Sequence, residues 1–489
     1  MKRVKKNLLR ALVALAALYL VLLIPGSSDD ALNLPQNKTP FAWNQDAVWL
    51  QMEQEFKAAK KMPAADMDTI TGFYQKKLLH QLFALGDTMI KYNDPRLFAI
   101  EESFFHAAAY AAATPDPGWY VRSSNAFRSF VKQQSRNWDV KDTAVKNTLY
   151  KLLYGLRAAT EEVLLQTNTP VDTADVLVQP ERSAAPFTTI FGVKVHSGDL
   201  LVSRGGAEVS ALISRGNDYP GNFSHVALIY VEEKTNRPYL IEAHIEKGVA
   251  LSSVEQYVQD KKLRFMVLRL RNDLPVMQQD SLLAHYAAKV AYEAALRRHI
   301  PYDFKMNFYD SAAMFCSEVA SYAYKTKGVQ LWQHISTISS AGVVNWLHDF
   351  GVENFVTQMP SDLEYDPQLS IVAEWRDPGT LYKDHIDNAA MDAMLEKANQ
   401  GQTISYNHWM LPVARCIKAW SWIKNRFGKE GMIPEGMNAT RALKNQTFVA
   451  MHKTVREMVQ QQAEAFHRQN GYRPPYWQLV KFAQDAANK

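Results

Sequence analysis

Hydrophobic and polar residues follow different spacings in successive parts of the chain. Between about residues 41 and 170, apolar side chains recur three and four positions apart, which predicts amphipathic helices. From about 187 to 271, short runs such as "FSHVALIYVEE" and "RPYLIEAHI" are separated by turns, which predicts β-strands. Helical spacing returns in "MQQDSLLAHYAAKVAYEAALRR" and "AAMFCSEVASYAYKTKG", and it dominates after about residue 384. The pattern predicts an α+β chain with its strands in the middle.

These changes of pattern divide the chain into five parts. We expect a signal segment at 1–25, a polar linker at 26–40, an α-helical domain at 41–170, a mixed domain at 187–383 and an α-helical C-terminal region at 384–489. With 489 residues, of which 47% are hydrophobic and 21% are charged, the composition is that of an ordinary globular protein.

The first residues have the layout of an export signal. The basic stretch "MKRVKKN" precedes an apolar run whose length lies between that of a signal peptide and that of a short membrane span. No A-x-A cleavage site or lipobox cysteine follows, so we expect an uncleaved signal anchor, with a cleaved signal peptide or a buried helix as alternatives. Basic residues before the run favour a cytoplasmic N-terminus. We therefore expect a protein that is anchored in the inner membrane or periplasmic, in a bacterium.

The charge balance bears on the partners of the protein. The net charge is +5, and no dense basic run interleaved with aromatic residues is present, so we expect no nucleic-acid partner. A membrane partner, contacted through the N-terminal segment, follows from the export signal.

The chain contains two cysteines, Cys316 and Cys416. In an exported protein they could form one disulfide, but no framework of paired cysteines exists. We expect Cys416 to be a buried helical residue. It lies in the basic, tryptophan-rich stretch "WMLPVARCIKAWSWIKNRFGK", which fits either a packed amphipathic helix or a lipid surface.

Cys316 has the position of a candidate nucleophile. It follows the loop-like "NFYDS" and opens a short helix in "MFCSEVASYAY". The N-terminus of a helix favours a thiolate and offers free N–H groups to an oxyanion. A cysteine nucleophile also needs a base, and His225 at the head of a predicted strand is the candidate. The alternative is a structural histidine that caps the strand.

Two polar residues on the next predicted strand are candidates for orienting that base. Glu242 and His244 are two positions apart, so they face the same side of the strand. Consecutive strands usually pair, which would bring this side next to His225. A carboxylate there would fix the tautomer of the histidine and stabilise its charged form. The alternative for Glu242 is a surface charge on an edge strand.

The order of these motifs resembles a known family. The succession "HSGDLLVSRGG", "FSHVALIYV", "LIEAHIEKGV", "IPYDF" and "MFCSEVASYAY" is similar to the circularly permuted, YiiX/YebB-like branch of the NlpC-type papain-like cysteine hydrolases. These enzymes are distant relatives of the lecithin retinol acyltransferase-like enzymes. The resemblance covers about residues 187–383 and implies a small antiparallel sheet packed on the helix of the catalytic cysteine.

The resemblance also implies a role for each candidate. Cys316 would be the nucleophile, His225 the general base and Glu242 the orienting residue, with His244 as an alternative third member. Tyr302 matches a tyrosine of the oxyanion site, where the Cys316 N–H would be the second donor, and Asp303 would support it or act as a turn residue. No cofactor and no metal are implied.

The function that follows is a thiol hydrolase of the cell envelope. It would cleave an amide, such as a peptide of peptidoglycan, through a thioester. A lipid ester or amide acyl hydrolase or acyltransferase on the same triad is one alternative. A zinc site formed by His196, His225, His244 and Cys316 is another, and a non-catalytic binding scaffold is the third. The glycine-rich segment 203–222 is expected to line the substrate cleft.

Overall fold

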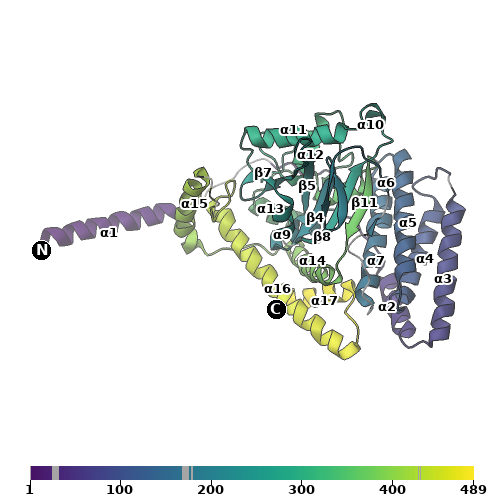
Figure 1. Cartoon of the computed structure of the whole chain (residues 1–489). Coiled ribbons are helices and arrows are strands. Elements are labelled where there is room, and N and C mark those ends of the chain that lie inside the picture. Colours follow the sequence, from purple (N-terminus) through teal and green to yellow (C-terminus); the bar gives the residue numbers. More distant parts are fainter. Residues whose placement is uncertain are drawn as a thin grey trace.

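The computed structural model has α+β architecture, with an antiparallel sheet flanked by helical N- and C-terminal regions (Figure 1). It describes residues 2–24, 32–86, 88–167, 176–177, 180–260, 262–427, 429 and 431–488. Part of the predicted linker, 26–31, lies outside the described residues. Its described part runs along the body of the protein, where Asn33 forms an isolated parallel bridge with Asn354.

The N-terminal region is helical, as predicted. Its helices are α2 (Asp46–Ala59), α3 (Ala64–Leu85), α4 (Pro95–Ala111), α5 (Gly118–Gln134), α6 (Thr143–Leu149) and α7 (Gly155–Gln166). A π-helical turn, Tyr150–Tyr154, joins α6 to α7. Aromatic side chains such as Phe104 and Phe127 stack in the core of this region. The boundaries of the domains remain predictions.

The central sheet has seven strands, in the order β1-β11-β8-β4-β5-β6-β7, and its neighbours are all antiparallel. The strands are β1 (Val176–Leu177), β4 (Leu200–Gly205), β5 (His225–Val231), β6 (Pro238–His244), β7 (Gly248–Ser252), β8 (Lys262–Leu270) and β11 (Leu369–Trp375). Two short pairs lie outside it, β2 (Phe187–Ile190) with β3 (Val193–His196) and β9 (Ser336–Thr337) with β10 (Val356–Thr357).

Strand alternation places two different cores on the two faces of the sheet. On β5, Val226 and Leu228 belong to the core shared with α11 (Leu283–Arg297) and α12 (Cys316–Lys325). Ala227 and Ile229 belong to a second core on the opposite face. This separation follows the period of two that the sequence showed.

The C-terminal region is also helical. It comprises α14 (Pro378–Asn399), α15 (Leu411–Arg426), α16 (Ala439–Asn470) and α17 (Tyr476–Ala487). Shorter helices are α8 (Glu208–Arg215), α9 (Val254–Gln259), α10 (Pro275–Gln279) and α13 (Ala341–Asp349). Helix α8 lies within segment 203–222, which the sequence suggested was a cleft-lining loop. Its Ala211 and Leu212 are buried in a core with α13 and α14, because hydrophobic spacing overrides the flanking glycines.

Helix α1 (Lys2–Leu22) extends away from the body of the protein, and its C-terminal end meets α15 (Figure 1). The hydroxyl of Tyr19 donates a hydrogen bond to the carbonyl oxygen of Trp409 over 2.8 Å. In the described part of the chain, no helix combines the length and the apolar character needed to cross a membrane. The expected membrane-spanning anchor is therefore not supported.

Buried ion pairs join the N-terminal helices to the sheet. Arg157 on α7 lies 2.7 Å from Glu364, and Arg128 on α5 lies 2.5 Å from Glu374 on β11. The ammonium of Lys132 donates to the carbonyl oxygens of Glu364 and Asp366. These side chains are fully or almost fully buried, so the two regions meet through a closed ionic interface.

Candidate active site

Cys316 is the first residue of α12 and lies at its N-terminus, as predicted. The helix begins there because the carboxylate of Glu318 accepts a hydrogen bond from the backbone N–H of Phe315 over 2.9 Å. The thiol is 5% exposed, and its sulfur lies 3.9 Å from the carbonyl oxygen of Ser224. This contact places the cysteine beside the start of β5, where His225 follows Ser224.

His225 forms the contact that the sequence predicted on the neighbouring strand. Its Nε2 lies 2.8 Å from a carboxylate oxygen of Glu242 on β6. Because Nε2 is used in this bond, Nδ1 is the nitrogen left for Cys316, whose interaction with His225 contributes to the raised pKa of the histidine. The side chain of Glu242 is 1% exposed and that of His225 is 19% exposed. A buried carboxylate thus holds a partly exposed imidazole beside the cysteine.

The charges of the three groups depend on one another. Burial alone would lower the pKa of His225, but its hydrogen bonds and charge interactions with Cys316 and Glu242 raise it to about 9. Burial would raise the pKa of Glu242, yet the hydrogen bond from His225 and the electrostatic interactions with His225 and His244 hold it well below its ordinary value. At neutral pH the arrangement therefore favours an imidazolium at His225, bonded to the anionic carboxylate of Glu242.

His244, the alternative third member, lies in the same cluster. Its Nε2 is 3.6 Å from the second oxygen of Glu242, and its ring centroid is 5.9 Å from that of His225. The close hydrogen bond to His225 comes from Glu242. His244 contacts the carboxylate from the other side, where it stabilises the negative charge of Glu242.

Tyr302 and Asp303 lie on the loop that precedes α12. The backbone of Met314 pairs with this loop, since its N–H donates to Pro301 and its carbonyl accepts from Asp303. Burial and the negative charges of Cys316 and Asp303 raise the pKa of Tyr302 well above its ordinary value, so its hydroxyl keeps a proton to donate. The carboxylate of Asp303 accepts backbone hydrogen bonds from Lys305 and Asn307, which is the turn role considered for it.

The structure adds three residues that the sequence did not single out. Burial raises the pKa of Glu318 to about 9 despite its hydrogen bond from Phe315, and the charges of Asp303 and Cys316 add to the shift. Ser203 on β4 is the direct cross-strand partner of His225. The hydroxyl of Tyr257 is buried near the charge of Glu242, and both effects raise its pKa. A helix-capping glutamate is visible in the spacing of "FCSE", but the proximity of Tyr257 to Glu242 has no local signal.

The other candidates from the sequence lie apart from this cluster. The Nδ1 of His196, on β3, is 2.7 Å from the carbonyl oxygen of Ala185. Across the residues that the structure describes, no group of three or more His, Cys, Asp or Glu side chains could hold a metal ion. Both cysteines are free, and Cys416 is exposed on α15, so the expectation that it is buried was wrong. One face of this amphipathic helix is left uncovered by the rest of the fold.

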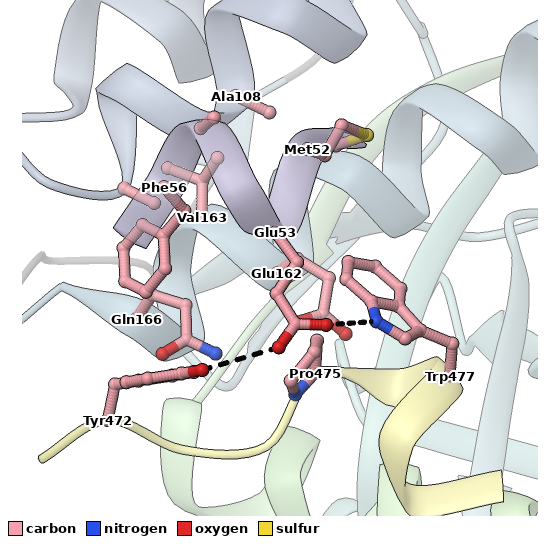
Figure 2. A pocket seen from close by; sticks show the side chains of 12 residues that line it. Met52, Glu53, Phe56, Ala108, Glu162, Val163, Gln166, Tyr472, Pro475 and Trp477 are labelled. Atoms are coloured by element: carbon pink, nitrogen blue, oxygen red, sulfur yellow. Dashed lines mark hydrogen bonds between the residues drawn. The ribbon is translucent and has the colours of Figure 1, made fainter. Parts of the chain in front are cut away.

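Two cavities lie on the opposite side of the N-terminal helices, between α2, α7 and α17. Figure 2 shows the smaller, of about 40 Å³, in which Tyr472 and Trp477 both donate hydrogen bonds to the carboxylate of Glu53. The larger, of about 570 Å³, shares Met52 and Trp477 with it. Neither cavity is lined by Cys316, His225 or Glu242, so both are separate from the candidate active site.

Comparison with known families agrees with the resemblance. Residues 194–373 match the model of a family of permuted papain-like amidase enzymes, YaeF/YiiX, the C92 family. No curated protein and no solved structure matches the chain. The matched segment runs from β3 to β11 and includes the strands of His225 and Glu242 and the helix of Cys316. The protein therefore contains a papain-like cysteine hydrolase domain of this permuted family.

Proposed function

We propose that the protein hydrolyses an amide in the cell envelope, with Cys316 as nucleophile, His225 as general acid and base, and Glu242 as the residue that orients His225. The observation that carries the proposal is the position of His225, which is bonded to the buried carboxylate of Glu242. It follows Ser224, whose carbonyl oxygen contacts the sulfur of Cys316 at the N-terminus of a helix. A buried structural histidine would need one partner, whereas this one links a carboxylate to a nucleophile.

The cycle follows from these positions. The thiolate of Cys316 attacks the carbonyl carbon, and the oxyanion accepts hydrogen bonds from the Cys316 N–H and the Tyr302 hydroxyl. The imidazolium of His225 donates its proton to the departing nitrogen, the C–N bond breaks, and a thioester remains on the sulfur. His225 then accepts a proton from water, the hydroxide attacks the thioester, and the thiolate leaves with the carboxylic acid released.

The substrate class is supported by the sequence. A basic and apolar N-terminal segment fits an exported protein, anchored in the inner membrane or periplasmic, for which a peptide of peptidoglycan is an accessible amide. A lipid ester or amide is the second candidate, because α15 exposes large apolar side chains such as Trp420 and Phe427. An acyl acceptor other than water would make the same site an acyltransferase.

The proposal can be tested by the rate of iodoacetamide alkylation at each cysteine, followed by mass spectrometry across a range of pH. Exposed Cys416 is a reference thiol in the same chain. We expect Cys316 to react rapidly well below pH 7, because the imidazolium favours its thiolate, and to react there much faster than Cys416.

The His225→Ala variant is the control for access. Removing the ring opens space next to Cys316, so a loss of reactivity at low pH cannot come from poorer access to the sulfur. Rapid reaction at low pH that disappears in this variant supports the triad. If Cys316 and Cys416 instead titrate together in the native protein, no thiolate–imidazolium pair exists and the scaffold alternative is favoured.

A further inference from the structure

Helix α15 has an apolar face that no other part of the described chain covers. Its members, Val413, Cys416, Trp420, Ile423 and Phe427, recur three and four positions apart, so they lie along one side of the helix. Trp420 is 59% exposed and Phe427 is 78% exposed. The opposite side packs into the protein through buried residues, namely Leu411, Pro412, Ala414 and Ser421. We call the exposed set the apolar face of α15.

The charges on helix α15 itself have a single sign. It contains no aspartate or glutamate, and it carries Lys424 and Arg426 in its last turn; Lys429 and Glu430 follow in the sequence. Trp422, two positions after Trp420, is exposed on another side of the helix, where its ring centroid lies 5.7 Å from the guanidinium of Arg426. Two further cations of the helix are used inside the protein, since Arg415 donates to the Leu22 carbonyl and Lys418 to the loop after α15. The surface is therefore apolar, aromatic and positively charged.

Helix α1 extends this surface. Its C-terminal end is fixed to α15 by hydrogen bonds from Tyr19 and Arg415 (Figure 1). Large apolar side chains along α1 are more than half exposed; they include Leu9, Leu12, Val13, Leu15, Leu18 and Leu20. Many exposed large apolar side chains on two adjoining helices indicate an interaction surface rather than isolated surface residues.

We propose that the apolar face of α15 is a docking surface for an anionic lipid bilayer. Tryptophan and phenylalanine side chains enter the boundary between headgroups and acyl chains, and the cations at the end of the helix contact the phosphates. The helix lies in the plane of the interface and does not cross the bilayer. A protein partner would need its own acidic surface, whereas an anionic bilayer meets both the apolar and the cationic parts of the surface at once.

The loop that follows α15 connects this surface to the loop of Tyr302. The backbone of Gly436 approaches the ring of Phe304 so closely that an added Cβ would lie 2.5 Å from it and 3.6 Å from the carbonyl oxygen of Tyr302. A bilayer bound at α15 is thus one loop away from the candidate oxyanion site. This last step rests on the proposed function, and it favours a substrate presented by the lipid surface.

Vesicle flotation tests the docking surface without using catalysis. The full chain carrying Cys316→Ala is mixed with vesicles of phosphatidylcholine alone or with vesicles that also contain about 30% phosphatidylglycerol. The second lipid makes the surface anionic, so that each cation of the protein near it adds to binding. We expect binding to the anionic vesicles, weakened by salt. Trp420→Ala/Ile423→Ala/Phe427→Ala and Lys424→Glu/Arg426→Glu should each reduce the partition coefficient about tenfold or more.

Matched controls come from α3, on the far side of the molecule. Phe83 is 84% exposed and Phe73 is also exposed, so Phe73→Ala/Phe83→Ala removes similar apolar area. Lys76→Glu/Lys77→Glu makes the same charge change at exposed positions. Both controls should bind vesicles like the parent chain. If the α15 variants bind as strongly as the parent, or the parent does not bind, the proposal is wrong.

A second measurement does not depend on any α15 substitution. In the Cys316→Ala chain, Cys416 is the remaining thiol, and a polarity-sensitive fluorophore attached to it reports on the apolar face. A blue shift on addition of anionic vesicles supports docking through this face. An unchanged spectrum while the protein floats with the vesicles shows that another surface binds. A shift that depends on protein concentration without vesicles shows that a second copy covers the face, and this too overturns the proposal.

Discussion

Charged side chains are buried in two regions of this protein, around Glu364 and around Cys316. Around Glu364, the guanidinium groups of Arg128 and Arg157 both contact the carboxylate, and all three side chains are almost completely inaccessible. Around Cys316, His225 lies between a thiol and the carboxylate of Glu242, and it remains partly exposed. The first region joins two parts of the fold, whereas the second leaves a reactive atom beside a group that can change its protonation state.

The pKa values express the same difference. At the interface, burial would lower the pKa of Arg157, but Glu364 and Glu161 raise it further above its ordinary range, so its charge is fixed at any accessible pH. In the cluster around Cys316, opposing effects place the pKa of His225 at about 9, within reach of ordinary conditions. Where opposite charges outweigh the cost of burying a charged group, the group stays ionised and has a structural role. Where the two effects nearly cancel, the group can gain or lose a proton.

The largest effect is expected from the reacting groups. Cys316→Ala should abolish amide hydrolysis, and His225→Ala should lower kcat/KM about 10²–10⁴-fold, the usual contribution of a general acid or base. The initial rate on the best amide found by screening measures this, and circular dichroism shows whether the domain is folded. We expect Cys316→Ala to unfold at nearly the parent temperature. His225→Ala leaves the buried carboxylate of Glu242 without its hydrogen-bonded partner, so this variant should stay folded but unfold at a lower temperature. A folded His225→Ala variant with full activity would contradict the assignment of the base.

The next effect concerns stability and tests the other region. Arg157→Met leaves the buried carboxylate of Glu364 short of one partner, and removing one member of a buried pair costs about 3–5 kcal/mol in the free energy of unfolding. Urea denaturation measures it. The control is Arg297→Met in an exposed pair with Glu293, where a loss of about 0.5 kcal/mol or less is expected. Similar losses in both variants would show that the interface is not the stabilising element described above.

The sequence predicted the site because each of its parts has a local signal. His225 and Glu242 are exceptions to the apolar pattern of two neighbouring strands, and Cys316 opens a short amphipathic helix. Antiparallel pairing of β5 with β6 then brings the histidine and the carboxylate together. Whether Glu242 or His244 forms the hydrogen bond with His225 depends on side-chain rotamers, which the sequence pattern does not predict.

The features that the sequence did not predict depend on contacts between residues that are far apart in the chain. Nothing local pairs Arg128 with Glu374, which are 246 positions apart. Strand β11 lies beyond the segment 187–271 in which strands were predicted, and a bulge between Ile371 and Ala373 breaks its alternation. Periodicity also showed that α15 has an apolar face, but not whether the fold covers it, so Cys416 was wrongly expected to be buried.

The smallest effect separates Glu242 from His244. A hydrogen bond to a charged group contributes about 1.5–3 kcal/mol, so Glu242→Gln should lower kcat/KM about 10–100-fold, and His244→Ala less. The pH profile gives a sharper test than the rate. Burial lowers the pKa of His225, while Cys316 and Glu242 raise it to about 9, and deprotonation of this imidazolium sets the alkaline limb of activity.

Removing the charge of Glu242 takes away part of what raises that pKa, so the alkaline limb should move downward from about pH 9, towards the ordinary histidine value of 6.5. The stability that the raised pKa provides, which is complete below pH 6.5 and lost as the pH rises through about 9, should shrink in the same variant. His244→Ala keeps the 2.8 Å bond between Glu242 and His225, so its limb should stay near that of the parent. A limb that moves with His244→Ala but not with Glu242→Gln would make His244 the group that supports His225. The ability of the cluster around Cys316 to change its protonation state, which the ionic interface lacks, would then depend on two coupled histidines rather than on the carboxylate of Glu242.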